Sequence, residues 1–183
     1  NGLVTTDGTK VPMTWMDSSR PDGTPIIPRS GYIVEFNALW YNALKFAQNL
    51  FADDVASIDQ VKVWEEITDK AKDAFINTFL NESGYLYDYV DGYYSDPSVR
   101  PNMIIAAGLD YSPLDRRQRK SVLDFVTREL LTPKGLRTLS PNSYGYKPWY
   151  LGNPEEREEA YYQGSARPWL LGFYADAYVK VFG

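Results

Sequence analysis

The chain of 183 residues contains no cysteine and no histidine. Without cysteine it can form no disulfide, zinc–thiolate site or thiol nucleophile. Without histidine it has neither a serine–histidine pair nor an imidazole metal ligand of its own. Proton transfer would therefore fall to carboxylates, tyrosine or lysine, and nothing in the sequence suggests a metal or a cofactor.

Runs of like charge and long apolar runs are also lacking. The 24 acidic and 19 basic residues give a formal net charge of −5 and are spread along the chain. Such a chain has no basic patch for a phosphate backbone, so we expect no nucleic-acid partner. No segment approaches the ~20 consecutive apolar residues of a membrane-spanning helix, so we expect no membrane partner and a cytoplasmic location.

Aromatic residues, in contrast, are plentiful. They make up 15% of the chain, with 15 tyrosines and 5 tryptophans, and many stand beside glycine, proline, aspartate or asparagine. Flat rings can stack on the C–H faces of sugars while nearby polar groups bind the hydroxyls. The alternative is that these rings simply fill the core.

The hydrophobic content of 44% is enough for one ordinary core, so we expect a single domain over 1–183. The spacing of apolar residues predicts five helices, at 33–50, 58–80, 101–109, 114–131 and 165–182. Strand signals are weak, the best being 86–90 and then 26–27. The sequence therefore predicts an all-α fold.

Three long segments separate these helices, at 1–30, 82–100 and 132–160. They are rich in glycine, proline, aspartate, asparagine and tyrosine, and long ordered segments of this kind are usually functional. We expect the helices to be the scaffold and these segments to carry the site. The abrupt beginning with a long loop suggests a fragment of a larger catalytic domain.

Residues that could carry chemistry cluster in four places: acidic, amide and aromatic residues at 14–17, 34–42 and 85–92, and an arginine with an asparagine at 100–102. Glycoside hydrolysis needs two carboxyl groups flanking the scissile bond, and these clusters supply them. The last cluster opens a helix, where free N–H groups can bind oxygen atoms. Each aspartate could instead form a turn or cap a helix, and Asn37 could be satisfied within the protein rather than by a sugar.

The order of these motifs resembles the C-terminal amylo-α-1,6-glucosidase domain of glycogen debranching enzymes. The resemblance begins with Thr14-Trp15-Met16-Asp17, Thr24-Pro25-Ile26-Ile27-Pro28-Arg29 and Val34-Glu35-Phe36-Asn37-Ala38-Leu39-Trp40-Tyr41-Asn42. It continues through Gly84-Tyr85-Leu86-Tyr87-Asp88, Arg100-Pro101-Asn102, Gly135-Leu136-Arg137-Thr138-Leu139-Ser140-Pro141, Gln163-Gly164 and Pro168-Trp169-Leu170-Leu171-Gly172.

The resemblance implies an (α/α)6 toroid, in which six inner and six outer helices enclose a pocket rimmed by loops. With helices of the usual ~11–12 residues, this chain supplies about half of such a toroid. Half a toroid leaves its inner helices uncovered, so we expect exposed apolar surface and possible self-association through it.

The implied activity is inverting hydrolysis of α-1,6-linked glucose branch stubs, with glycogen or a related α-glucan as the partner. Asp17 matches the carboxylate of the family's Trp-Met-Asp motif and is the predicted general acid. The predicted bases are Glu35 and Glu158, and inversion requires the two carboxyls to lie ~6.5–9.5 Å apart. The predicted substrate-binding residues are Trp15, Asn37, Asp88, Arg100, Asn102 and Gln163.

The chain departs from the family at the C-terminal motif. Eukaryotic members place a glutamate at the position of Ala166, and bacterial members carry histidine and tryptophan at the positions of Tyr162 and Arg167. A sugar-binding domain that has lost one catalytic carboxyl is therefore an alternative. A helical interaction scaffold without sugar specificity is another.

Overall fold

The computed structural model describes all 183 residues, and 45% of them are helical, well above the ~30–35% of average domains. Four of the five predicted helices are confirmed to within two residues at each end. The helices are α1 (Val34–Leu50), the 3-10 helix η1 (Val55–Ser57), α2 (Ile58–Phe79), α3 (Met103–Gly108), α4 (Arg116–Leu130), α5 (Pro154–Ala160) and α6 (Leu171–Phe182).

Two small antiparallel sheets accompany the helices, so the all-α prediction holds only in part. One sheet has the order β1 (Tyr32–Ile33), β2 (Tyr89–Asp91), β3 (Tyr94–Ser95). The other has the order β4 (Leu131–Thr132), β5 (Gly135–Arg137), β6 (Ala166–Arg167). The strand predicted at 86–90 lies at 89–91, and the one predicted at 26–27 was wrong.

The start of the last helix and the content of the 132–160 segment were also predicted wrongly. β6 pairs with β5 through Leu136 and Arg167, and Pro168 follows directly, so α6 begins only at Leu171. The segment 132–160 contains α5, whose beginning is well marked: Asn153 caps it through the Glu156 N–H, and Pro154 occupies its first turn.

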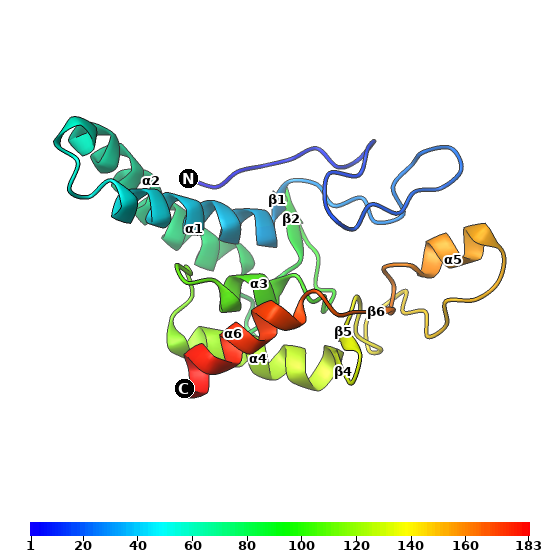
Figure 1. Cartoon of the computed structure of the whole chain (residues 1–183). Helices are drawn as coiled ribbons and strands as arrows, with labels where there is room; N and C mark the ends of the chain where they lie inside the picture. The colour runs from blue at the N-terminus through cyan, green and yellow to red at the C-terminus, as the bar shows by residue number, and fades with distance from the viewer.

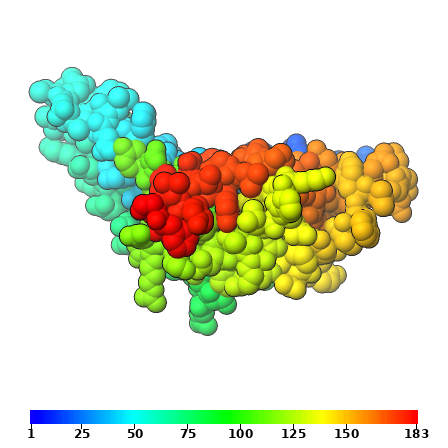
Figure 2. Space-filling view, turned by 60° about the horizontal axis from the view of Figure 1, so that its bottom comes forward, coloured from blue at the N-terminus to red at the C-terminus, as the bar shows by residue number.

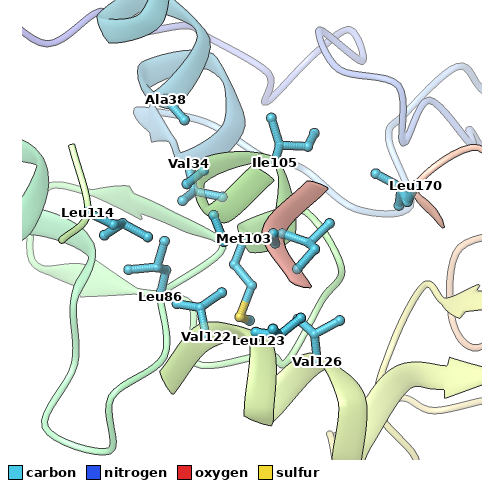
Figure 3. Packing of buried hydrophobic residues seen from close by; sticks show 14 of the residues in the cluster. Val34, Ala38, Leu86, Met103, Ile105, Leu114, Val122, Leu123, Val126 and Leu170 are labelled. Atoms are coloured by element: carbon cyan, nitrogen blue, oxygen red, sulfur yellow. The ribbon is translucent and has the colours of Figure 1, made fainter. Parts of the chain in front are cut away.

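The core is organised around the short helix α3, in which every residue is buried. α1, α4 and α6 all pack against it. Figure 3 shows Met103 pointing from α3 towards Val122 and Leu123 of α4, with Val34 of α1 and Leu86 close by. A helix of six residues gains little from its own hydrogen bonds, so its position depends on this burial.

The helices are arranged so that the long segments meet. In Figure 1, α1 and α6 begin on the side where β1, β5 and β6 lie, while α2 and α4 run back towards that side. The tip of the α1–α2 hairpin projects from one end of the molecule and α5 from the other (Figure 2). Alternation of this kind is compatible with part of a helical toroid, whose closure remains a prediction.

Apolar side chains remain exposed on α1, α2 and α6. Leu39, Phe46 and Leu50 form a stripe on α1, and Val179 and Phe182 lie on the exposed side of α6. Self-association through such a surface stays a prediction. No helix has both the length and the apolar character needed to cross a membrane.

Candidate functional site

The buried side chain of Arg29 lies at the centre of a network of charges. Its Nη1 and Nη2 donate to Oε1 and Oε2 of Glu35 at 2.5 and 2.6 Å, and its Nε donates to Oδ2 of Asp88 at 2.7 Å. Burial alone would lower the pKa of Arg29, but the carboxylates of Asp88 and Glu35 raise it above its usual value. The guanidinium therefore stays charged and joins two carboxylates that are far apart in the sequence.

Backbone pairing brings these three residues together. Glu35 lies in the first turn of α1, directly after β1, and Asp88 directly precedes β2. β1 pairs with β2 through Tyr32 and Val90, and the Asp88 carbonyl accepts from the Val34 N–H at 3.2 Å. Gly31, at φ +78°, allows the turn from Arg29 into β1, and a side chain there would collide with the Val90 carbonyl.

Asp88 also connects the network to an aromatic side chain. Its Oδ1 accepts from Nδ2 of Asn102 at 2.8 Å, and Oδ1 of Asn102 accepts from Nε1 of Trp15 at 2.8 Å. Asn102 is completely buried at the start of α3. Three predicted site residues thus form one chain of hydrogen bonds from the protein interior to a tryptophan.

Arg100 extends the network towards the C-terminal segment. Its Nη1 donates to the carbonyls of Thr138 and Tyr162, and its Nη2 donates to Oε1 of Gln163 at 2.9 Å. Its Nε lies 3.9 Å from Oδ2 of Asp88 and makes no hydrogen bond. Burial lowers the pKa of Arg100, although Asp88 and Asp96 oppose this effect.

Asp17 lies at the edge of this network and is exposed to solvent. Its Oδ1 accepts from the hydroxyl of Tyr162 at 2.9 Å. Burial raises the pKa of Tyr162 well above its usual value, and the hydrogen bond to Asp17 raises it further. The phenol therefore remains a donor at neutral pH, and it fixes one oxygen of the aspartate while the other is free to act.

Aromatic rings pack next to Tyr162, the residue that binds this carboxylate. The ring of Trp15 meets those of Tyr162 and Trp169 edge to face, with centroids 5.3 and 5.1 Å apart. The guanidinium of Arg167 lies over the Tyr161 ring, 3.9 Å from its centroid, and its Nη2 donates to the Tyr161 carbonyl. Arg167, a departure from the bacterial pattern, thus packs against Tyr161 and also lies near the ring of Tyr162, which holds Asp17.

Glu158 lies on α5 and lines a cavity of about 400 Å³. Its neighbour Glu159 is engaged with Arg20 at 3.4 Å and Lys147 at 3.6 Å, whereas the carboxylate of Glu158 has no partner in the protein. The cavity is lined by Ser19, Arg20, Pro21, Ile26, Pro154, Glu155, Glu158 and Glu159.

The predicted site residues therefore have different surroundings. Asn37 uses its amide to hold the N-terminal segment, accepting from the Val4 N–H and donating to the Val4 and Ile33 carbonyls, so no polar atom is left for a sugar. Both oxygens of Glu35 are bound by Arg29. Asp17 and Glu158, in contrast, reach the surface, and no group of three or more acidic residues converges as metal ligands would.

Two residues at the centre of this arrangement were not predicted from the sequence. Arg29 stood within a recognised motif, but nothing in its spacing pairs it with Asp88, which lies 59 positions further on. Tyr162 was noted only as a departure from the family pattern. The usable signal for Arg29 was its place directly after the apolar Ile26–Pro28 stretch, since a charge that is buried there needs a partner.

We expect Arg29→Met to lower the free energy of unfolding by about 3–5 kcal/mol, because it leaves two buried carboxylates without their counter-charge. Urea denaturation monitored by circular dichroism measures this change. The matched control is Arg20→Met, whose ion pair with Glu159 is partly exposed, and it should cost at most about 1 kcal/mol. Equal and small losses in both variants would contradict a central role for Arg29.

Comparison with known proteins shows the family of this chain. The family model described as amylo-alpha-1,6-glucosidase matches residues 1–182. The chain is also 27% identical to the glycogen debranching enzyme of Saccharomyces cerevisiae over 205 aligned residues, which cover 90% of this chain and 13% of the yeast protein. It therefore spans only a small part of that relative's length. On the strength of the family match, the chain belongs to the amylo-α-1,6-glucosidase family.

Proposed function

We propose that this chain carries out the hydrolysis of α-1,6-linked glucose branch stubs in glycogen-like glucans, with Asp17 as the general acid. Family membership supports the class of reaction. The observation that carries the assignment is the position of Asp17, an exposed carboxyl bound by Tyr162, whose ring packs edge to face against Trp15. A sugar can stack on the partly exposed ring of Trp15 while its glycosidic oxygen meets the acid.

In this mechanism Asp17 gives its proton to the glycosidic oxygen as the bond from that oxygen to C1 of glucose breaks. Water attacks C1 from the opposite face, and a carboxylate takes up the proton that the water loses. Glucose leaves as the β-anomer, and the remaining chain regains a free 6-hydroxyl. Proton NMR of the first product distinguishes inversion from retention.

Glu158 is the better base candidate of the two, because its carboxylate is free of protein partners. Both oxygens of Glu35 accept from Arg29 and the side chain is buried, so it has no free oxygen with which to bind the attacking water. We assign Glu35 to the framework that holds Asp88 in place. Asp88, Arg100 and Asn102 join it there and position Trp15 and Gln163.

Gln163 and Trp15 are the framework's contacts with the substrate in this proposal. Because Oε1 of Gln163 accepts from Arg100, its Nε2 group is oriented and left to donate to a sugar hydroxyl. Trp15 has its indole N–H fixed by Asn102, so the orientation of its ring is set before a sugar binds. Both side chains are therefore pre-organised, which lowers the entropic cost of binding.

Sugar binding without hydrolysis is the second candidate function. It is favoured by the occupied carboxylate of Glu35 and by Ala166, which stands where eukaryotic members carry a glutamate. The two functions differ in one outcome. Release of glucose from a phosphorylase limit dextrin by the full-length protein supports hydrolysis, and saturable binding of that dextrin without release supports the sugar-binding function.

We expect Asp17→Asn to lower the rate on an α-1,6-linked glucan at least ~10²-fold, with substrate binding little changed, because the amide keeps the shape but cannot give a proton. α-Glucosyl fluoride needs no protonation of its leaving group, so much of the rate on that substrate should remain. Asp53→Asn, an exposed change between α1 and α2, is the control. Full activity of the Asp17 variant on the glucan would remove Asp17 from the mechanism.

Tyr162→Phe should lower kcat on the same glucan about tenfold with little change in KM, since the hydrogen bond that orients Asp17 is lost. Hydrolysis of α-glucosyl fluoride should be nearly unaffected, a contrast that a general structural defect would not produce. The control is Tyr93→Phe, at a fully exposed tyrosine. Equal losses on both substrates would show that Tyr162 acts on the fold rather than on the acid.

Glu158→Gln should lower the rates on both the glucan and α-glucosyl fluoride at least ~10²-fold, because activation of water is needed whichever group leaves. Glu65→Gln, at an exposed position on α2, serves as the control. Steady-state kinetics on the two substrates separates the base from the acid. A Glu158 variant that hydrolyses the fluoride at the original rate would rule out Glu158 as the base.

A further inference from the structure

A second cavity of about 400 Å³ lies away from Asp17, between the β2–β3 hairpin, the end of α4 and the segment 140–144. None of the predicted site residues lines it. Its lining consists of tyrosines, serines and two carboxylates, together with Pro97, Val99 and Asn142: Tyr85, Tyr94, Asp96, Pro97, Ser98, Val99, Glu129, Ser140, Asn142, Ser143 and Tyr144.

Asp96 provides an unused acceptor in this cavity. It is only 6% exposed, and its Oδ1 accepts from the Ser98 N–H at 3.2 Å, the Ser98 hydroxyl at 2.8 Å and the Tyr94 hydroxyl at 3.5 Å. Its Oδ2 accepts no hydrogen bond from the protein. Burial raises the pKa of Asp96, and the nearby charge of Asp88 adds to this effect. A ligand hydroxyl that donates a hydrogen bond to Oδ2 would stabilise such a buried carboxyl group.

Glu129 holds the opposite wall in place. Its Oε2 accepts from the Ser140 hydroxyl at 2.7 Å and from Nδ2 of Asn142 at 2.8 Å. The hydrogen bond from Ser140 lowers the pKa of Glu129, so it remains a carboxylate at neutral pH. The segment that carries Tyr144 is therefore anchored before a ligand arrives.

Aromatic rings complete the cavity. Tyr144 is fully exposed and Tyr94 is about half exposed, while the Tyr85 hydroxyl is fixed by the Pro97 carbonyl at 2.9 Å. Exposed rings beside a free carboxyl oxygen match a neutral ring with hydroxyls on its edge and C–H groups on its face. The two carboxylates disfavour an anion, and Glu129 is already engaged, which leaves too few free oxygens for a cation.

We propose that this cavity binds a glucosyl residue of an α-glucan chain, as a holding site separate from the reacting centre. The inference rests on the proposed function, which makes an α-glucan the sugar that this chain meets. Its location supports a role in holding polymer, because Val99 borders the cavity and the adjacent Arg100 belongs to the network behind Asp17. A long chain could then occupy both sites, while a small substrate needs only the reacting centre.

The test is a site-specific titration of the full-length protein with maltoheptaose, observed by fluorine NMR of 3-fluorotyrosine placed at position 144. We expect a saturable shift of this signal, and we expect Asp96→Asn, which keeps the shape of the side chain, to raise the apparent Kd about fivefold or more. The same label at position 93, on a neighbouring tyrosine that is fully exposed but outside the cavity, should not move.

Tyr144→Ala provides a second variant that cannot disturb the core, because the side chain makes no buried contact. It should raise the KM for glycogen about fivefold and leave the hydrolysis of α-glucosyl fluoride unchanged. The absence of a shift at position 144, or an unchanged Kd in Asp96→Asn, would overturn the holding site. An equal shift at position 93 would also overturn it, because binding would then be unspecific.

The two proposals fail in different ways. If the unmodified protein hydrolyses neither glucan nor fluoride but the signal at position 144 still saturates, the catalytic proposal is wrong and the holding site stands. If hydrolysis proceeds and position 144 gives no response, the holding site is wrong and the catalytic proposal stands.

Discussion

The attraction between the guanidinium of Arg29 and the two carboxylates of Glu35 and Asp88 is the interaction on which the rest of the site depends. It joins the N-terminal segment, the first turn of α1 and the segment before β2, where the pairing of β1 with β2 covers only two residues of each strand. Such a buried arrangement is weak evidence for net stability, but loss of one member leaves uncompensated charge. Its main effect is to fix the positions of these three segments relative to one another.

That geometry divides the charged residues into two groups. The carboxylates of Glu35 and Asp88 are buried and fully bonded, so they position other groups. Asp17 and Glu158 reach solvent and keep oxygen atoms free, which is what a proton donor and a proton acceptor require. Residue type alone does not separate these groups. Burial and the number of protein partners do.

Much of the fold could be predicted because helical periodicity is local: α1 and α2 were placed almost to the residue. The start of α6 was not, since a long-range pairing of Arg167 with Leu136 competes with helix formation there. α5 was overlooked although Asn153, Pro154 and Glu156 mark its beginning. At the site, the sequence was enough to predict which segments take part. It was not enough to predict the hydrogen bonds of Glu35 and Asn37, because their partners Arg29 and Val4 come from other segments.

The two carboxylates of the proposed reaction are held with different rigidity, and this difference has a chemical consequence. Asp17 is bonded to Tyr162, whose carbonyl is in turn held by the buried Arg100. Glu158 lies on a seven-residue helix whose attachment to the loop at Arg20 and to Lys147 depends on partly exposed ion pairs through Glu159, and such pairs contribute at most about 1 kcal/mol each. These ion pairs therefore hold α5 less tightly than the buried side chain of Arg100 holds the segment of Tyr162. In the proposed reaction a water molecule must fit between the base and the sugar, and a weakly held base side makes room for that water at little cost.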